Sequence, residues 1–280
     1  MRLRTLITAA ALSGLGSSLV SPASAQVLSL KGSDTMLALA QGWAAAYMKA
    51  RPGRSVSVTG GGSTTGIASL INGGCDIANA SRVMKGSELD KAKARGFVPR
   101  EYAVARDGLA IVVNPANPVA KITMDQLKKI YNGTYTNWKQ LGGREQAIVT
   151  VGRDSSSGTY GFFQDTVLGI GRPYRPDMQT TPSTNSIAQT ISQDAGAIGY
   201  VGVAYAKEFG AKVRIIPVAG GSADAVMPSL ETVRTGKYPL SRYLFMYTRG
   251  NPSGTAKDFI DWVRSPQGQA VVSQVGYFPL

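Results

Sequence analysis

The polar segment from Arg153 to Thr159 carries the residue types that suit the binding of a small anion. The run 147–151 before it is apolar and β-branched, which predicts a buried strand, and the aromatic run after it predicts a helix. We therefore expect a strand-to-helix loop in which Ser157, Gly158 and Thr159 lie at the helix start. Free N–H groups at a helix start favour an anion, and an arginine such as Arg153 can donate two hydrogen bonds to one oxyanion.

A helix cap is the alternative interpretation of these residues, because serine and threonine are common N-cap residues. Binding gains support because three more predicted strands are followed by polar loops. These strands are 26–30, 55–58 and 76–80, and their loops are 31–35, 60–66 and 81–82. In open α/β sheets the ligand crevice lies beyond the carboxyl ends of the strands, so we expect all four loops to meet there.

Together the four loops supply hydroxyl groups, backbone N–H groups and two cations, which is a donor-rich set that suits a small oxyanion. The hydroxyls and cations are Thr35, Ser63, Ser81, Ser157, Thr159, Arg82 and Arg153. A glycine-rich loop such as 60–66 is also common as a plain turn. The recurrence of the same strand, loop and helix unit favours the functional interpretation.

The composition excludes most familiar routes to catalysis. The chain has no histidine, and Cys75 is its single cysteine, so Ser-His-Asp chemistry, Cys-His chemistry and histidine-based zinc sites are impossible. We expect Cys75 to be a small buried residue. No Walker loop, dinucleotide-binding glycine motif or EF-hand loop occurs. We predict no catalytic residue, no metal and no cofactor, and keep a secreted phosphatase with a serine or threonine nucleophile as a weaker alternative.

The first 25 residues have the features of a cleavable secretory signal peptide. Arg2 and Arg4 form a basic start, 6–19 is largely apolar, and 23–25 fits an A-x-A cleavage site. This segment contains no cysteine, which argues against a lipoprotein, and no later apolar run is long enough to span a membrane. We therefore predict a soluble mature protein in the periplasm.

The mature chain is strongly basic. The formal charge is +13, and removal of Arg2 and Arg4 lowers it to +11, which suits an anionic ligand or surface. The densest basic stretch, 82–106, lacks the interleaved aromatic residues expected of a protein that binds single-stranded nucleic acid. We expect a solvated helix face there and no nucleic-acid partner.

An ordered set of motifs in the chain resembles the periplasmic phosphate-binding proteins of bacterial phosphate ABC importers. The motifs span essentially the whole mature chain: 32–35, 60–66, 76–82, 137–138, 153–159, 196–200, 238–242 and 265–268. No single motif is decisive, but their order along the chain is highly specific.

This resemblance implies an α/β fold of the two-lobed periplasmic binding protein type II, in which each lobe is a mixed sheet flanked by helices and the ligand cleft lies between the lobes. The extended runs 103–113 and 241–247 are natural strands for crossing from one lobe to the other. The expected division is the signal peptide 1–25, lobe I in 26–106 and 246–280, and lobe II in 107–245.

The resemblance also implies a monomeric, non-catalytic receptor that binds inorganic phosphate and delivers it to an inner-membrane ABC permease. A receptor for another oxyanion, such as sulfate or molybdate, remains an alternative. Positions matching the family's ligand contacts are Thr35, Met36, Ser63, Arg153, Ser157, Gly158 and Thr159, and the same loops add Ser33, Asp34, Gly62, Ser81 and Arg82.

One position departs from part of the family. Some members carry an aspartate after the third strand that accepts the proton of bound phosphate, whereas this chain has Arg82 there. An arginine attracts an anion but accepts no proton. Asp34 is the candidate acceptor in its place, with a role as a helix cap as the alternative.

Overall fold

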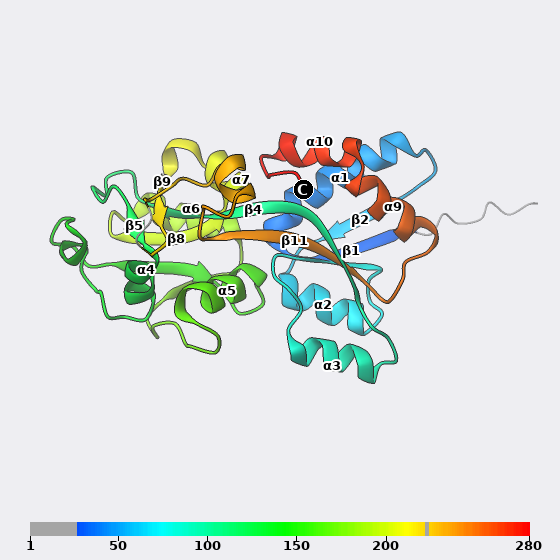
Figure 1. The fold of residues 1–280 in the computed structure, drawn as a ribbon, viewed down its shortest axis with the longest axis horizontal. Helices are drawn as coiled ribbons and strands as arrows, with labels where there is room; N and C mark the ends of the chain where they lie inside the picture. Colours follow the sequence, from blue (N-terminus) through cyan, green and yellow to red (C-terminus); the bar gives the residue numbers. More distant parts are fainter. Residues whose placement is uncertain (1–26, 222–223) are drawn as a thin grey trace, which may run out of the picture.

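The computed structural model describes residues 27–221 and 224–280, and the predicted signal peptide lies outside these residues. Two lobes stand side by side, and the long strands β4 (Arg100–Val113) and β11 (Ser241–Thr248) run between them (Figure 1). This arrangement confirms the predicted two-lobed α/β fold, in which both crossing strands were expected.

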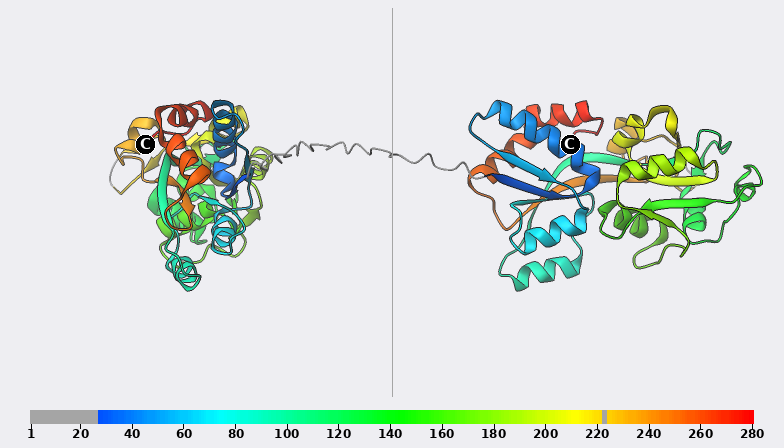
Figure 2. Two further views of the ribbon diagram at one scale, coloured as in Figure 1. Left: turned by 90° about the vertical axis from the view of Figure 1, so that its right-hand side faces the viewer. Right: turned by 180° about the vertical axis from the view of Figure 1, so that it is seen from behind.

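Lobe I is built around three parallel strands, with β1 in the middle. Its elements are β1 (Leu28–Gly32), β2 (Val56–Thr59), β3 (Ile77–Ala80), α1 (Leu37–Ala50), α2 (Ser63–Ile71), α3 (Gly86–Ala94), α9 (Gly254–Arg264) and α10 (Pro266–Val275). Helices α1, α9 and α10 cover one face of the sheet, and α2 and α3 cover the other (Figures 1 and 2). Both faces are buried because parallel strands joined by crossover helices are covered on both sides.

Lobe II contains β6 (Val149–Arg153), β7 (Gln179–Thr181), β8 (Ala197–Gly202) and β9 (Arg214–Ile216), and a small pair of strands, β5 (Ile122–Thr123) and β10 (Val218–Ala219). Its helices are α4 (Met124–Tyr131), α5 (Gly158–Phe163), α6 (Thr184–Gln193), α7 (Val203–Glu208) and α8 (Leu230–Arg234). Short 3₁₀ turns lie at 138–141 and 210–212, a third (η1, Asp34–Met36) precedes α1, and a π-helical turn at 164–168 extends α5.

The two lobes share one continuous sheet, whose strand order is β2-β1-β3-β11-β4-β8-β6-β7, with β9 beside β4. The first part of β4, residues 100–108, pairs with β11, and the last part, 109–113, pairs with β8 of lobe II. Strand β4 therefore belongs to both lobes and links them directly.

The buried hydrophobic residues form clusters that follow the two lobes. One lobe I cluster contains Trp43, Tyr47 and Phe259, and the largest lobe II cluster contains Tyr131 and Tyr200. Strand residues alternate between clusters on the two faces of the sheet, as the period of a strand requires. A few residues cross over, since Leu244 packs in a lobe I cluster and Phe278 in the lobe II cluster. We retain the boundaries 26–106, 107–245 and 246–280 as a proposal.

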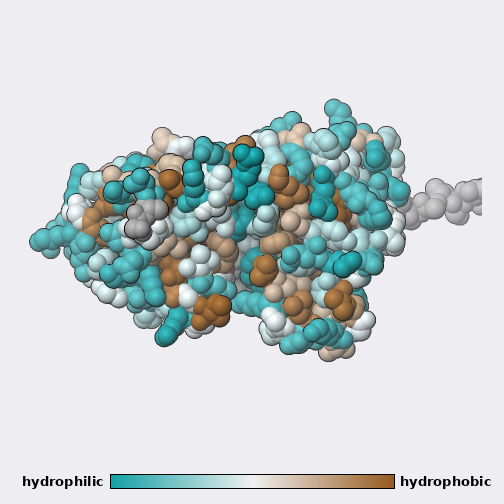
Figure 3. Space-filling view, in the orientation of Figure 1, coloured by the Kyte–Doolittle hydropathy of each residue, from teal (hydrophilic) through white to brown (hydrophobic). Residues whose placement is uncertain are grey.

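The outer surface is mostly hydrophilic, with hydrophobic residues in small groups and a hollow between the lobes at the lower edge (Figure 3). Among the described residues, no helix has the length and apolar character needed to cross a membrane.

Candidate functional site

Four hydroxyl groups from both lobes meet between the ends of the strands, and we call them the hydroxyl cluster: Thr35, Ser63, Ser81 and Thr159. The Oγ1 atoms of Thr35 and Thr159 lie 2.7 Å apart, and Ser81 Oγ lies 3.4 Å from Thr159 Oγ1 and 3.3 Å from Ser63 Oγ. None of the four is more than 2% exposed. The predicted loops therefore converge, and they do so out of contact with solvent.

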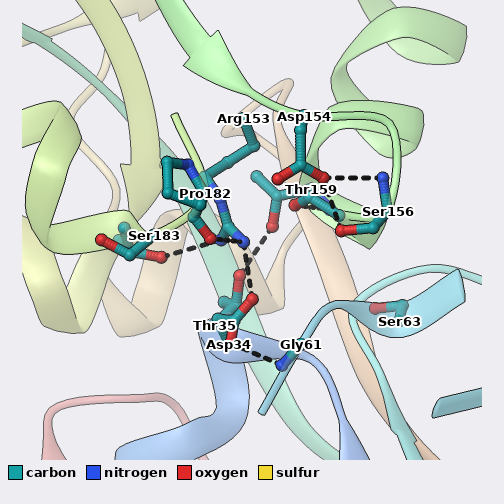
Figure 4. A network of polar contacts seen from close by, with 12 residues as sticks. Asp34, Thr35, Gly61, Ser63, Arg153, Asp154, Ser156, Thr159, Pro182 and Ser183 are labelled. Atoms are coloured by element: carbon teal, nitrogen blue, oxygen red, sulfur yellow. Dashed lines mark hydrogen bonds and ion pairs between the residues drawn. The ribbon is translucent and has the colours of Figure 1, made fainter. Parts of the chain in front are cut away.

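Arg153 ends β6 beside this cluster and is 1% exposed (Figure 4). Its Nη2 donates to Asp34 Oδ2 at 2.6 Å and to the carbonyl oxygen of Pro182 at 2.9 Å, and its Nη1 donates to Thr184 Oγ1 at 3.2 Å. Its Nε is buried and has no hydrogen-bond partner among the described residues. An orphaned buried donor is costly, so this N–H marks where an acceptor is missing.

Asp34 connects the two lobes. One of its carboxylate oxygens accepts the bond from Arg153, and the other accepts the backbone N–H of Gly61 at 2.9 Å. Asp34 is the first residue of η1, the residue before it is Ser33, and neither side chain makes a cap hydrogen bond there. The alternative of a helix cap for Asp34 therefore has no bond to support it.

The loop that carries Ser33, Thr35 and Met36 is held by two tyrosine hydroxyls that the sequence did not single out. Tyr205 donates to the carbonyl oxygen of Asp34 at 2.9 Å, and Tyr277 donates to that of Thr35 at 2.5 Å. Burial raises the pKa of Tyr205, so its phenol stays protonated and keeps donating.

Two predicted residues of this loop differ in how their polar groups are used. Ser33 Oγ is buried and has no partner within the described part of the chain, which leaves it available to a ligand. The backbone N–H of Met36, expected to bind the anion, donates instead to the carbonyl oxygen of Ser33 at 3.1 Å.

The start of α5 contains the helix cap that its sequence offered as one interpretation, and the binding of an anion there stays a prediction. Ser157 Oγ accepts the backbone N–H groups of Thr159 and Tyr160 at 3.2 and 3.4 Å, so Ser157 is the N-cap of α5. Gly158 comes so close to lobe I that an added Cβ would lie 2.2 Å from Ser63 Oγ. The glycine is needed for the approach of the two lobes.

Gly62 serves the same approach from the other side. Its φ is +91°, and an added Cβ would lie 2.4 Å from the carbonyl oxygen of Ser156. The next residue but one, Thr64, donates its backbone N–H to that same oxygen at 3.0 Å. Loops from opposite lobes are thus in direct contact, and the structure is in a closed conformation.

Arg82 lies next to the hydroxyl cluster, but its charge is already paired. Its guanidinium donates to both carboxylate oxygens of Glu88 at 2.7 and 2.8 Å and to Thr64 Oγ1 at 3.0 Å. The sequence offered Arg82 as a second cation for the anion. The contact with Glu88, six residues further on, could not be foreseen, because a loop separates the two residues.

No group of three or more potential metal ligands occurs among the described residues. The chemistry of this site is hydrogen-bond donation from hydroxyl, amide and guanidinium groups, together with one carboxylate acceptor. Such a set suits a small oxyanion that carries several acceptors and at least one proton.

Known proteins with similar sequences decide the family. Residues 19–267 match the PBP superfamily domain. The chain is 35% identical over 254 residues to the phosphate-binding protein PstS of Bacillus subtilis, which covers 90% of this chain and 80% of that protein. It is 33% identical over 271 residues to PstS of Pseudomonas aeruginosa, covering 90% and 83%. The chain belongs to the PstS family of phosphate-binding proteins.

Solved structures of PstS-like proteins have the same fold. A Clostridium perfringens protein, described as a phosphate ABC transporter substrate-binding protein and solved with phosphate bound, gives a TM-score of 0.82 at 30% identity, covering 91% of this chain and 100% of that one. An ABC-type phosphate transport receptor from Vibrio cholerae gives 0.73 at 30% identity, covering 90% and 100%. The predicted family and the predicted fold are both confirmed.

Proposed function

We propose that this protein is a non-catalytic receptor that binds inorganic phosphate between its lobes and delivers it to an inner-membrane ABC permease. The observation that carries the proposal is the buried Nε of Arg153, which has no acceptor within 27–221 and 224–280 and belongs to a side chain beside the hydroxyl cluster. The phosphate-binding names of the PstS relatives, and the phosphate bound in the Clostridium perfringens protein, support the same ligand.

The proposed contacts come from the loops that the structure brings together. The anion accepts bonds from Arg153 Nε and from the hydroxyl cluster, whose members then exchange their bonds to one another for bonds to the ligand. The complete proposed set is Ser33, Asp34, Thr35, Ser63, Ser81, Arg153, Ser157, Gly158 and Thr159. The predicted contacts Met36 and Gly62 are left out, because their backbone N–H groups already donate to the carbonyl oxygens of Ser33 and Gly32. Arg82 lies near the hydroxyl cluster, but its guanidinium is paired with Glu88, so in this proposal it makes no direct bond to the anion.

The proposed contacts are hydrogen bonds to a charged ligand, which are stronger than bonds between neutral groups. Each contributes roughly 1.5–3 kcal/mol. Affinity therefore depends on several of them forming together, since binding must also offset the cost of ordering the ligand and the loops.

Asp34 supplies the selectivity in this proposal. At neutral pH phosphate carries a proton that it can donate to a carboxylate, whereas sulfate carries none. A carboxylate facing an unprotonated anion is an unpaired acceptor near a like charge, which disfavours sulfate.

Delivery to a permease implies that the receptor is exported. We therefore retain the predicted signal peptide in 1–25, the periplasmic location without a lipid anchor, and the monomeric state as parts of the proposal. Mass spectrometry of the secreted protein tests the cleavage: a mature chain beginning at Gln26 without a lipid supports it, and an intact Met1 or a lipid-sized mass increase contradicts it.

Isothermal titration tests the identity of the ligand. The mature protein is first unfolded and refolded, which removes any ligand already bound. We expect one-to-one binding of phosphate and little heat with sulfate or molybdate. If sulfate or molybdate binds more tightly than phosphate, phosphate is not the ligand. If none of the three anions gives heat, the proposed function is refuted.

Arg153→Met in the same titration tests the site. The substitution removes the guanidinium, and we expect phosphate affinity to fall at least a hundredfold. The matched control is Arg175→Met, which removes another lobe II arginine that is paired with an aspartate, Asp177, and should leave affinity unchanged. Equal affinity of Arg153→Met and the unsubstituted protein would refute the placement of the site.

A further inference from the structure

The motif 238–242 ends in an arginine that lies at the crossing between the lobes. Arg242 on β11 is directly opposite Asp107 on β4, and its Nε and Nη2 both donate to Asp107 Oδ2, at 2.9 and 2.7 Å. The side chains are 3% and 0% exposed. This buried ion pair joins the two strands on which the lobes are connected.

Each partner of the pair also holds one lobe. Arg242 Nη1 donates to the carbonyl oxygen of Ser81 at 3.1 Å, and Ser81 belongs to the hydroxyl cluster. Asp107 Oδ1 accepts the backbone N–H of Val203, the first residue of α7 in lobe II, at 3.1 Å. The pair therefore forms a hydrogen-bonded bridge from the ligand loop of lobe I to lobe II.

Arg242 contacts the second wall of the cleft as well. Its guanidinium carbon lies 5.1 Å from the centre of the Phe162 ring, within the range of a cation–π contact. Phe162 belongs to α5, the helix whose first turn carries Gly158 and Thr159. One guanidinium thus touches the crossing strand, the Ser81 loop and the ligand-bearing helix of lobe II.

A contribution to the stability of the fold does not by itself explain the buried pair of Arg242 and Asp107. The desolvation of two charges offsets much of their attraction, so buried pairs are frequently no more stabilising than apolar residues of the same size. What apolar residues cannot supply is the directed bonds to Ser81 and Val203.

We propose that Arg242 and Asp107 are positioning residues for phosphate binding, which set the orientation of the Ser81 loop against lobe II in the closed conformation. This proposal rests on the proposed function of the protein. The pair acts through Ser81 and α7 and makes no contact with the anion itself.

The test uses the double variant Arg242→Met/Asp107→Leu, which removes both charges together and so leaves no unpaired buried charge. Phosphate affinity is measured by titration, and the thermal midpoint of the ligand-free protein is measured in parallel. We expect affinity to fall at least tenfold while the ligand-free protein remains folded. Arg242→Lys keeps the charge but cannot bond Asp107 and Ser81 with the same geometry. Its phosphate affinity should lie between those of the double variant and the unsubstituted protein.

Tyr47→Phe is the matched control. It removes the hydrogen bond from Tyr47 on α1 to Asp258 on α9, which contacts no residue of the hydroxyl cluster, and should lower the thermal midpoint without changing affinity. If the double variant also lowers the thermal midpoint and leaves affinity unchanged, the pair is only structural and the proposal is wrong. If the unsubstituted protein does not bind phosphate, the proposed function itself fails.

Discussion

Arg153 and Asp34 hold opposite charges 2.6 Å apart, each on a different lobe. The pair uses one guanidinium nitrogen, Nη2, and leaves Nε without a hydrogen-bond partner among the described residues. The carboxylate has a second function, because its other oxygen fixes Gly61 in the glycine-rich loop. Removal of the acid therefore alters the charge of the site and the order of a neighbouring loop.

Asp34→Asn should narrow the preference for phosphate over sulfate. The amide no longer neutralises Arg153, so sulfate affinity should rise, while phosphate loses a charge-assisted bond worth roughly 1.5–3 kcal/mol, about tenfold or more in affinity. Competition between the two anions for each variant measures the ratio. A ratio that does not move would mean that Asp34 only holds the loop.

Gly158→Ala should weaken phosphate binding by blocking closure. The added methyl group would lie 2.2 Å from Ser63 Oγ on the other lobe, so the lobes must stay apart, while each lobe can keep its own packing. Titration should show at least a tenfold loss.

The matched control is Gly86→Ala at the first residue of α3, where an added Cβ meets no atom within 4 Å and affinity should be unchanged. Full affinity of Gly158→Ala would show that the lobes do not approach each other as closely in the bound protein.

At the scale of elements, local sequence predicts most of the fold. Threonine and serine are common N-cap residues. Thr123 accepts the N–H of Gln126 at the start of α4, and Ser183 caps α6. Strand boundaries shift by about two residues, as with 26–30, which is observed as Leu28–Gly32. Such shifts arise because pairing partners, which local pattern does not reveal, decide where a strand ends.

Contacts between elements that are far apart in the chain could not be predicted from the sequence. Tyr205 and Tyr277 are separated from the loop they hold by more than 170 residues, and each looks like an ordinary core aromatic. Local pattern also does not show that Arg82 is paired with Glu88, whereas Arg153 keeps one N–H without a partner in the part of the chain that the structure describes. Residue types were predictable in this site, but the division of their bonds was not.

The packing of α1 on α9 makes a prediction for alkaline pH. Burial, followed by the hydrogen bond to Asp258, raises the pKa of Tyr47 from 10.0 to about 12. Because the pKa is higher in the folded protein, this contribution to stability is fully present below pH 10 and is lost as the pH rises through 12.

We therefore expect the free energy of unfolding, measured by urea titration, to fall between pH 10 and pH 12, and to fall less steeply in Tyr47→Phe. Both proteins are measured without phosphate, so that changes in ligand binding do not affect the free energy of unfolding. Equal slopes in the two proteins would contradict the assignment of the raised pKa to Tyr47.

At the scale of the whole molecule, one sheet runs through both lobes, and β4 pairs with β11 in one lobe and with β8 in the other. The two crossing strands were predictable from their long apolar runs, and the continuous sheet was not. The closed conformation brings together loops that are 124 residues apart, as between Thr35 and Thr159. In the proposed function the anion lies between these two loops.

A crystal structure of the protein with arsenate tests this position of the anion most directly, because arsenate has the shape and charge of phosphate and a strong anomalous signal. We predict one anomalous peak enclosed by Arg153 Nε and the hydroxyls of Thr35, Ser63 and Thr159. The proposed site would be wrong if arsenate binds elsewhere in the molecule while the residues of the hydroxyl cluster remain bonded to one another.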